Sequence, residues 1–360
     1  MKYKSCNLIQ HGLCFFNEML VSCCFSPCDQ INGQTPPVLF ANYKGEVLSP
    51  DFLFERIDSY ANIFRNGGCP KECTNCCHIE EKDWDEEHYI NSITITHFSI
   101  CNADCIYCSN NLEKNERTNS MYDIIPVLTN LKEKGVIRKG CEFHIGGGEF
   151  TIYHEADEML KTFALTDFAT FYVPTNAIKY NENLFQAMNN KAAHIIVSLD
   201  CGTRKTFKKI KRIDAFNQVI SNLKLYSRTP QSSKAIGLKY IVIPSINDNF
   251  SEFKKFMKIA KEANIGKIII DIDARYTRLM NYNIDPYLIS FAERIRNAAK
   301  KQGFITEAYS FFSQCKHSSL NNNNNIFKYF ISYIKYKFFN SKIRKLYLSR
   351  LYGTKRKNIK

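Results

Sequence analysis

From residue 92 onward, short apolar runs rich in β-branched residues alternate with longer segments whose apolar residues recur every three or four positions. The short runs predict strands, and the longer segments, such as MYDIIPVLTNLKEKG and FSEFKKFMKIAKEAN, predict amphipathic helices. The expected strands are residues 92–98, 142–145, 170–173, 194–200, 237–243 and 267–273.

Strands that alternate with helices predict parallel βαβ units with right-handed crossovers. The six predicted units are fewer than the eight of a closed β/α barrel, so the pattern predicts an α/β fold with a partial (β/α)6 barrel. An open doubly wound sheet has the same alternation, and the pattern alone leaves it open.

The two ends of the chain have other patterns. Residues 1–88 combine cysteine, glycine and proline with only short apolar runs, which predicts a small module supported by metal. Residues 89–315 contain the predicted barrel, and residues 316–360 contain an Asn-rich linker and a basic tail.

The composition is that of an ordinary folded protein. The 360 residues are 44% hydrophobic and 23% charged, which excludes a disordered chain or one made of membrane spans. The first residues, MKYKSCNLIQHGLCFF, lack an unbroken apolar run and a small-residue cleavage site, so we expect no signal peptide and a cytoplasmic location.

The positive charge is concentrated in the tail. Residues 326–360 contain eleven Lys and Arg and no Asp or Glu, so the rest of the chain keeps about +3 of the formal net charge of +14. Apolar residues recur there at helical spacing, at Phe327, Phe330, Ile331, Ile334 and Phe338. A basic amphipathic helix suits an anionic membrane surface at the inner face of the membrane, whereas a helix packed on the barrel explains the pattern equally well. Nucleic-acid binding ranks below both, because no folded nucleic-acid module is recognisable.

Three cysteines follow the first predicted strand in the stretch CNADCIYC, at Cys101, Cys105 and Cys108. The chain has 15 cysteines, and a reducing compartment favours metal-binding or catalytic roles for them over disulfides. Three thiolates on a short loop can hold three irons of a [4Fe–4S] cube and leave the fourth iron open. The other readings are a zinc site completed by a distant residue such as His97, or coincidence.

This loop resembles the signature of the radical S-adenosylmethionine (radical SAM) superfamily, including an aromatic residue, Tyr107, before the third cysteine. The resemblance implies that Cys101, Cys105 and Cys108 ligate a [4Fe–4S] cluster whose open iron is chelated by S-adenosylmethionine (SAM). It further implies that an electron from the cluster cleaves SAM to methionine and a 5′-deoxyadenosyl radical, which abstracts hydrogen from a substrate.

A glycine-rich turn, FHIGGGEF, ends the second predicted strand. Such a turn is weak evidence alone, but glycines let a backbone approach a ligand and a carboxylate can meet an ammonium group. Gly146, Gly147, Gly148 and Glu149 resemble the superfamily's glycine-glycine-glutamate motif, which implies that they bind the SAM amino group. Phe150 stands where proline is common in that motif.

Short polar residues also end the next predicted strands. Asn176, Ser198 and Asp200 resemble the superfamily's contacts to the SAM carboxylate and ribose, and Pro244 and Asn247 resemble the part that faces adenine. Their other reading is that they are helix caps or turn formers, which such residues commonly are.

The N-terminal cysteines form two groups at the ends of residues 1–88. Cys14 and Cys23, with Cys73 and Cys76, make four ligands, which we prefer for an auxiliary [4Fe–4S] cluster, with structural zinc as the alternative. Close competitors are Cys24, Cys69 and Cys77. The layout resembles the SPASM or twitch auxiliary-cluster module of radical SAM enzymes, although that module usually follows the barrel and here precedes it.

The resemblance implies an enzyme with an unidentified substrate, either a peptide or protein to be modified or a sugar or other small molecule to be oxidised or dehydrated. It also implies a reductant such as flavodoxin or ferredoxin. No residue is assigned as catalytic from the sequence. The alternative is a non-catalytic scaffold protein that binds zinc or an iron–sulfur cluster.

Overall fold

The computed structural model describes residues 4–16, 18–23, 37–73, 76, 78–84, 87–108, 117–118, 120, 122–273 and 286–308. The chain divides into two compact units, which we describe separately. The first unit comprises Met1–Asn102, Asn115–Thr175 and Asn181–Ile195; the second comprises Ala103–Lys114, Asn176–Tyr180 and Ile196–Lys360.

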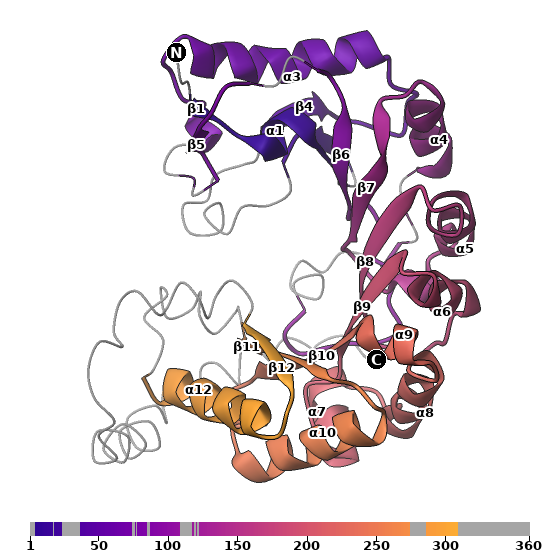
Figure 1. Ribbon diagram of the computed structural model, residues 1–360, viewed down its shortest axis with the longest axis vertical. Helices are drawn as coiled ribbons and strands as arrows, with labels where there is room; N and C mark the ends of the chain where they lie inside the picture. The colour runs from indigo at the N-terminus through magenta and orange to yellow at the C-terminus, as the bar shows by residue number, and fades with distance from the viewer. Residues whose placement is uncertain are drawn as a thin grey trace, which may run out of the picture. The chain divides into compact units, whose positions relative to one another are not determined.

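Parallel strands form the centre of the first unit (Figure 1). The strands are β6 (Ile90–Ile95), β7 (Ile137–Ile145) and β8 (Ala169–Thr175), and the beginning of β9 (Ala193–Ser198) follows them in sheet order. Thr94 of β6 is in register with His144 of β7, which is in register with Tyr172 of β8. Apolar residues such as Phe143 and Phe171 alternate with these polar ones, so one face of the sheet is apolar and the other polar.

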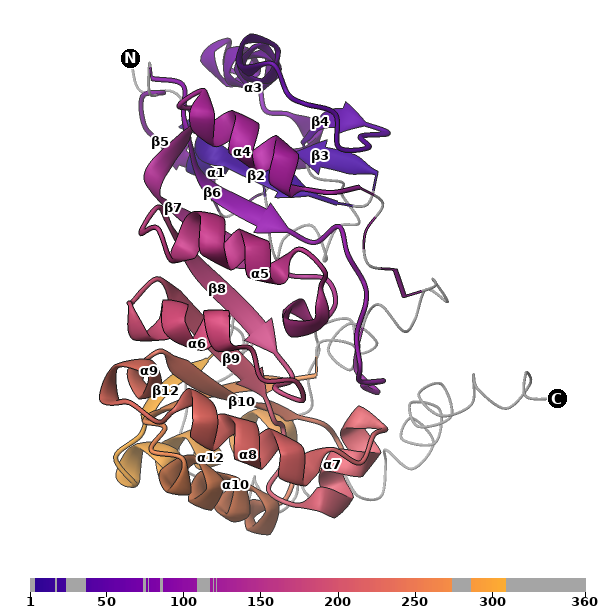
Figure 2. The same cartoon turned by 90° about the vertical axis from the view of Figure 1, so that its right-hand side faces the viewer.

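Helices cover the apolar face of these strands. Figure 2 shows α4 (Ile125–Glu133), α5 (Ala156–Met159) and α6 (Glu182–Asn189) in front of β6–β8. Phe143 packs on Phe163, which lies in the π-helical turn Leu160–Ala164 that follows α5, with ring centroids 5.2 Å apart. The carboxylate of Glu155 accepts hydrogen bonds from the N–H groups of Ile124 (3.0 Å) and Ile125 (2.9 Å), and so caps the start of α4.

The N-terminal residues continue the sheet of the first unit. Strand β2 (Gly12–Phe15) pairs in parallel with β6, with Cys14 opposite Thr94. Strands β3 (Met19–Val21) and β4 (Val38–Ala41) add antiparallel to β2. The remaining elements are β1 (Lys4–Ser5) paired with β5 (Glu80–Glu81), α1 (Asn7–His11), α3 (Pro50–Arg65) and the 3-10 turn Lys71–Cys73.

The second unit repeats the arrangement of parallel strands and helices. The end of β9 is followed in sheet order by β10 (Ile236–Val242), β11 (Lys267–Ile272) and β12 (Ile305–Ala308). Tyr240 of β10 packs on Phe253 and Phe256 of α10, with ring centroids 5.1 and 4.9 Å apart. The helices are α7 (Arg204–Lys211), α8 (Phe216–Tyr226), α9 (Pro230–Lys234), α10 (Phe250–Glu262) and α12 (Pro286–Lys301).

All six predicted strands are present in their sequence order in the sheet, and the pairs β6–β7, β7–β8 and β10–β11 are parallel, which confirms the predicted α/β fold class. The structure adds β12 at one end and β2, β3 and β4 at the other, which the sequence pattern did not predict. The predicted boundary at residue 315 and the basic tail lie outside the described residues. Among the helices that the structure describes, none combines the length and apolar character needed to cross a membrane.

Candidate cofactor site

In the first unit, the glycine-rich loop after β7 lies against the segment that leads to Cys101. The N–H groups of Gly148 and Glu149 donate hydrogen bonds to the carbonyl oxygens of Phe98 (3.1 Å) and Ile100 (2.7 Å). A Cβ atom on Gly148 would lie 2.0 Å from the Ile100 oxygen, so only glycine fits. Because these two N–H groups are already bonded, they offer no donor to a ligand, whereas carbonyl oxygens of such a loop suit an ammonium group.

The two preceding glycines are also constrained. A Cβ atom would lie 2.6 Å from Cγ2 of Thr96 if placed on Gly146 and 2.2 Å from the carbonyl oxygen of Phe98 if placed on Gly147. Gly147 has a φ of 76°, which disfavours other residues further. Phe150, which follows this loop and replaces the proline of the motif, is buried. Its side chain therefore anchors the turn in the apolar core.

The carboxylate of Glu149 is held by hydroxyl groups. Glu149 is 2% exposed, and its Oε1 accepts hydrogen bonds from the hydroxyls of Thr151 (2.8 Å) and Thr175 (2.7 Å). The backbone N–H of Thr151 donates a third bond at 3.2 Å. Three donors on one oxygen fix the orientation of a charged group, which is what a binding residue requires.

In the second unit, the cysteine loop packs on the C-terminal end of α7. The N–H of Asp104 donates to the carbonyl oxygen of Lys211 (3.0 Å), and the N–H of Ile106 donates to that of Ile210 (2.9 Å). The helix ends there because Arg212 adopts a left-handed conformation with a φ of 56°. The loop thus satisfies carbonyl groups that the helix end leaves unpaired. The two hydrogen bonds also fix the backbone on either side of Cys105.

The side chain of Lys211 is buried beside Asp200 and Tyr107. Its Nζ lies 2.6 Å from Oδ2 of Asp200 and donates to the Tyr107 hydroxyl oxygen at 2.6 Å. The Tyr107 hydroxyl donates to the same Asp200 oxygen at 2.5 Å, and Oδ1 of Asp200 accepts from the N–H of Ile241 at 2.9 Å. Both carboxylate oxygens of Asp200 are therefore hydrogen-bonded within the protein.

Burial and charge shift the pKa values of this cluster. Burial, with a further contribution from Asp200, raises the pKa of Tyr107 well above its ordinary value. Burial lowers the pKa of Lys211, but Asp200, Cys105 and Cys201 together raise it by more, so the net direction is upward and the ammonium stays charged. Burial raises the pKa of Cys105, while Lys211 lowers it, so a bound metal would have to displace the thiol proton.

The other predicted polar residues of the second unit lie at strand ends. Oδ1 of Asn176 accepts from the N–H of Ile178 at 2.9 Å, which is a turn-forming bond, and Ser198 is the last residue of β9. Asn247 donates to the carbonyl oxygens of Asp200 and Ile241, both at 2.7 Å, and so joins two strand ends. Contact of these residues with a ligand stays a prediction.

The N-terminal cysteines of the preferred set lie in buried or partly buried places of the first unit. Cys14 is on β2, Cys23 follows β3, and Cys73 packs in an apolar cluster with Cys6, Phe64 and Trp84. Burial raises the pKa of Cys6, and the neighbouring Cys76 thiol adds to the rise. Cys6 therefore lies near two members of that set, although the sequence analysis did not select it. Cys24 and Cys77 lie outside the described residues, and ligation by the preferred set stays a prediction.

His97, the distant ligand considered for a zinc site, lies in an aromatic cluster. Its Nε2 is 3.0 Å from the Tyr153 hydroxyl, and its ring stacks on Tyr122 with centroids 4.9 Å apart. Burial lowers the pKa of His97 to about 4, so the imidazole is neutral at pH 7. Cys141 and Cys201 are fully buried, where a cysteine side chain packs as a small apolar residue, and Cys315 lies outside the described residues.

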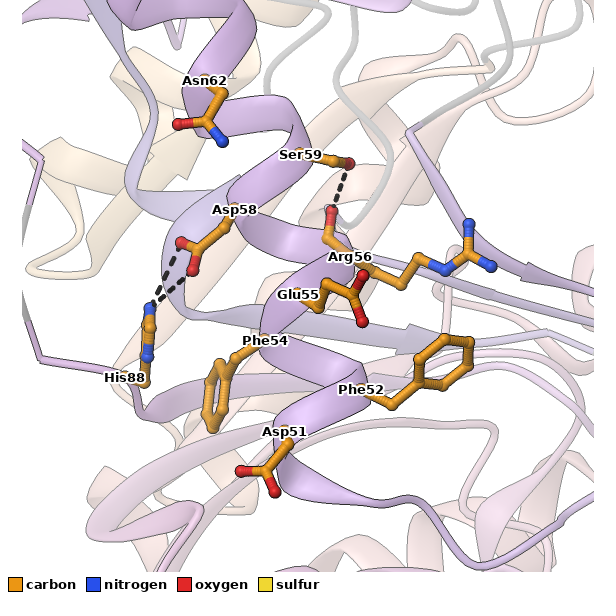
Figure 3. A pocket seen from close by; sticks show the side chains of 9 residues that line it. All are labelled: Asp51, Phe52, Phe54, Glu55, Arg56, Asp58, Ser59, Asn62 and His88. Carbon is orange, nitrogen blue, oxygen red and sulfur yellow. Dashed lines mark hydrogen bonds and ion pairs between the residues drawn. The ribbon is translucent and has the colours of Figure 1, made fainter.

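The first unit has two other features that resemble ligand sites. Asp123, His154 and Glu155 bring three donor atoms within 4.8 Å, but Glu155 caps α4, which explains its position without a metal. A groove of about 740 Å³ lies along α3, and the side chains that line it are drawn in Figure 3. In this groove, Nε2 of His88 lies 3.1 Å from Oδ2 of Asp58. None of the predicted site residues lines this groove.

Residues 95–260 match the radical SAM superfamily. The chain carries a radical SAM domain. The matched region begins at the end of β6 and contains the cysteine loop and the glycine-rich loop. The predicted recognition of this superfamily is confirmed, and with it the prediction of an enzyme at the level of the superfamily.

Curated relatives are similar to about half of this chain. A probable GTP 3′,8-cyclase of Saccharolobus islandicus is 26% identical over 181 residues, which are 49% of this chain and 54% of that protein. A protein of the same description from Metallosphaera sedula is 23% identical over 177 residues, which are 49% and 53% of the two chains. The chain spans about half the length of the curated relatives it matches.

Solved structures are similar in fold to this chain. SuiB of Streptococcus suis bound to its precursor peptide SuiA has a TM-score of 0.51 at 14% identity, covering 80% of this chain and 61% of SuiB. The structure of SuiB bound to S-adenosylmethionine gives 0.50 at 14% identity, covering 75% and 59%. This likeness confirms the fold, that of the radical SAM partial barrel.

Lys211 and Thr151 were missed by the sequence analysis. Lys211 lies in the basic run KKIKR, which reads as a solvated helix face, and no local signal distinguishes the one buried lysine from its neighbours. Thr151 follows the glycine-rich loop by two residues, and its proximity in sequence to Glu149 was an available signal.

Proposed function

We propose that Cys101, Cys105 and Cys108 hold a [4Fe–4S] cluster at which the protein reductively cleaves SAM. The three cysteines form no disulfide and are partly exposed on one short loop, and this donor set suits a cluster with one iron left open. When bound, the reduced cluster supplies the electron that cleaves the SAM sulfonium to methionine and a 5′-deoxyadenosyl radical, which takes a hydrogen atom from the substrate. The observation that carries the proposal is the spacing of these three cysteines within the region that matches the radical SAM superfamily.

The protein's own residues bind SAM in this proposal. The glycine-rich loop, Gly146 to Gly148, contacts the SAM amino group through carbonyl oxygens, and the buried Glu149 complements its positive charge. Asn176 and Ser198 contact the SAM carboxylate and ribose from their strand ends. Asp200 and Tyr107 also belong to the SAM site, with the hydrogen bonds between them supporting a fixed position for each.

The substrate is proposed by class. Either a peptide or protein is modified, or a sugar or related small molecule is oxidised or dehydrated. The first class is supported by the fold shared with SuiB, a protein solved with a precursor peptide, and the second by relatives described as cyclases of GTP. The alternative function is a non-catalytic scaffold that binds zinc or an iron–sulfur cluster.

Anaerobic reconstitution with iron and sulfide, followed by reduction in the presence of SAM, tests the proposal. The wild-type protein is expected to release 5′-deoxyadenosine, and the variant Cys101→Ala/Cys105→Ala/Cys108→Ala is expected to release none above background. A matched control is Cys141→Ala, which changes a buried cysteine outside the loop. Zinc in place of iron, or equal product from the triple variant, would contradict the proposal and favour the scaffold.

We further propose an auxiliary [4Fe–4S] cluster at Cys14, Cys23, Cys73 and Cys76. Its support is the number of N-terminal cysteines and the grouping of Cys73 and Cys76 with other thiols. The triple variant of the cysteine loop should keep about four irons per chain, the content of one cluster. Removing Cys73 and Cys76 as well should abolish that iron, whereas removing Cys201 instead should not. Iron that survives the loss of Cys73 and Cys76 would overturn this ligand set.

The remaining proposals concern partners and location. The cluster requires a reductant, for which we propose flavodoxin or ferredoxin. For the location we propose the reducing cytoplasm, which suits a chain with 15 cysteines. For the basic tail we propose binding to an anionic membrane surface, supported by its charge alone. Deleting residues 326–360 should abolish cosedimentation with liposomes of anionic lipid, and unchanged cosedimentation would exclude this role.

A further inference from the structure

The proposed function assigns Asp200 to the SAM site but gives no role to Lys211, the buried lysine that pairs with it. We propose that these two residues position the cysteine loop and keep the net charge beside the cluster near zero, so that the reduced cluster stays a strong reductant. This inference rests on the proposed cluster at Cys101, Cys105 and Cys108.

Lys211 holds the loop with both its backbone and its side chain. Its carbonyl oxygen accepts from the N–H of Asp104 at 3.0 Å, and its Nζ donates to the Tyr107 hydroxyl at 2.6 Å. The Nζ also lies 4.9 Å from the centroid of the Tyr107 ring. Tyr107 directly precedes Cys108, so a single lysine fixes the loop at two points on either side of Cys105.

The charges of the pair act with little screening. The side chains of Lys211 and Asp200 are 1% and 0% exposed, and buried charges influence their neighbours more strongly than solvated ones. Lys211 bonds to the loop at Asp104 and Tyr107, on either side of Cys105, so its charge lies close to this proposed ligand. A positive charge favours the reduced, more negative form of a cluster, which makes that form a weaker electron donor.

The carboxylate of Asp200 cancels this effect. A lone ammonium would still donate to the Tyr107 hydroxyl oxygen, but it would oppose the transfer of an electron to SAM. Because apolar residues can often replace a buried ion pair without loss of stability, stability alone does not require two charges here. The pair supplies the anchor for Tyr107 without a net charge.

The test is a redox titration of the reconstituted holoenzyme without SAM, followed by electron paramagnetic resonance. Asp200→Asn leaves the Lys211 charge uncompensated, so we expect the cluster of this variant to be easier to reduce. Its reduction equilibrium should shift about tenfold toward the reduced form, which raises the midpoint potential by about 59 mV for one electron. Asp200→Asn/Lys211→Met removes both charges and should return the potential to the wild-type value. Its cluster signal with SAM should nevertheless differ from wild type, since the Tyr107 anchor is lost.

The matched control is Asp214→Asn. This change adds the same charge at an exposed ion pair of Arg204 in α7, and it should leave the potential unchanged. Lys211→Arg, which keeps the charge, should also keep the potential. Iron content and circular dichroism of each variant establish that it is folded and loaded.

The outcomes separate the two proposals. Wild-type protein that takes up no cluster would contradict the proposed function itself. Loaded, folded Asp200→Asn with an unchanged or lower potential would overturn the charge role while leaving the proposed function intact. A double variant whose signal with SAM matches wild type would overturn the positioning role.

Discussion

The hydroxyl of Thr175, the last residue of β8, donates a 2.7 Å hydrogen bond to Oε1 of Glu149. Both residues are buried, so the bond joins a strand end to the carboxylate that we assign to the SAM amino group. Thr175→Val keeps the shape but removes the donor, and we expect it to lower the free energy of unfolding by about 1–3 kcal/mol. SAM affinity should fall severalfold, as measured by isothermal titration of the reconstituted protein.

The control for this prediction is Thr170→Val. Thr170 lies on the same strand and is partly buried, so the substitution is chemically identical. We expect a change in SAM affinity of less than twofold. Equal losses in the two variants would show that the Thr175 bond has no special effect on Glu149.

Gly148 is predicted to tolerate no side chain. In Gly148→Ala the new Cβ would lie 2.0 Å from the Ile100 oxygen, so the hydrogen bond from Glu149 to Ile100 must lengthen or break. We expect at least tenfold weaker SAM binding and a lower melting temperature. Gly266→Ala is the control, because nothing lies within 4 Å of its Cβ position. Similar behaviour of the two variants would contradict the close approach.

His97 is predicted to affect acid stability and not iron content. Its pKa of about 4 lies below the ordinary value of 6.5, so the unfolded chain binds the proton more tightly. The stability that the neutral imidazole contributes is present above pH 6.5 and is lost as the pH falls toward 4. His97→Phe should therefore show a smaller loss of unfolding free energy between pH 7 and pH 5 in urea titrations.

Iron content distinguishes this role from metal ligation. Reconstituted His97→Phe should bind as much iron as wild type, whereas Cys108→Ala should bind less. Loss of iron from His97→Phe would revive His97 as a ligand of the cysteine site.

Asp271 of β11 is predicted to lower the free energy of unfolding as the pH rises through 7. Burial raises the pKa of Asp271 to about 7, opposed by Lys239 and assisted by Asp273 and Asp200. The native state thus holds this proton more tightly than the unfolded chain. The resulting stability is present below the ordinary pKa of about 4 and is lost as the pH rises through 7. Asp271→Asn should gain stability relative to wild type between pH 5 and pH 8.

An exposed aspartate provides the comparison. Arg204 lowers the pKa of Asp214, so the stability that the Asp214 carboxylate contributes is complete above pH 5. The unfolding free energies of Asp214→Asn and of the wild type should therefore differ by the same amount at pH 5 and at pH 8. Urea unfolding at both pH values measures the difference. If the difference in unfolding free energy between Asp271→Asn and the wild type were the same at pH 5 and pH 8, Asp271 would not be protonated in the native state near neutral pH.

The parallel strands were predictable because each carries a local signal. Apolar runs such as KIIIDID alternate with amphipathic helices, and this pattern follows from burial of one face of a strand or helix. The pairing of β2 with β6 was not predictable, since it joins residues about 80 positions apart and β2 has only four residues. Short runs of this kind become strands only when a partner supplies hydrogen bonds.

The sequence by itself determined the cysteine loop, the glycine-rich loop and their order along the chain, because spacing and residue type are local properties. Only the tertiary structure decided that Lys211 is the buried lysine of its basic helix and that Asp200 binds it. The same holds for the hydroxyl of Thr175 on Glu149. The physical reason is that a charge is buried only where a distant part of the chain supplies its counter-charge or hydrogen bonds, and that distant part has no fixed spacing in the sequence.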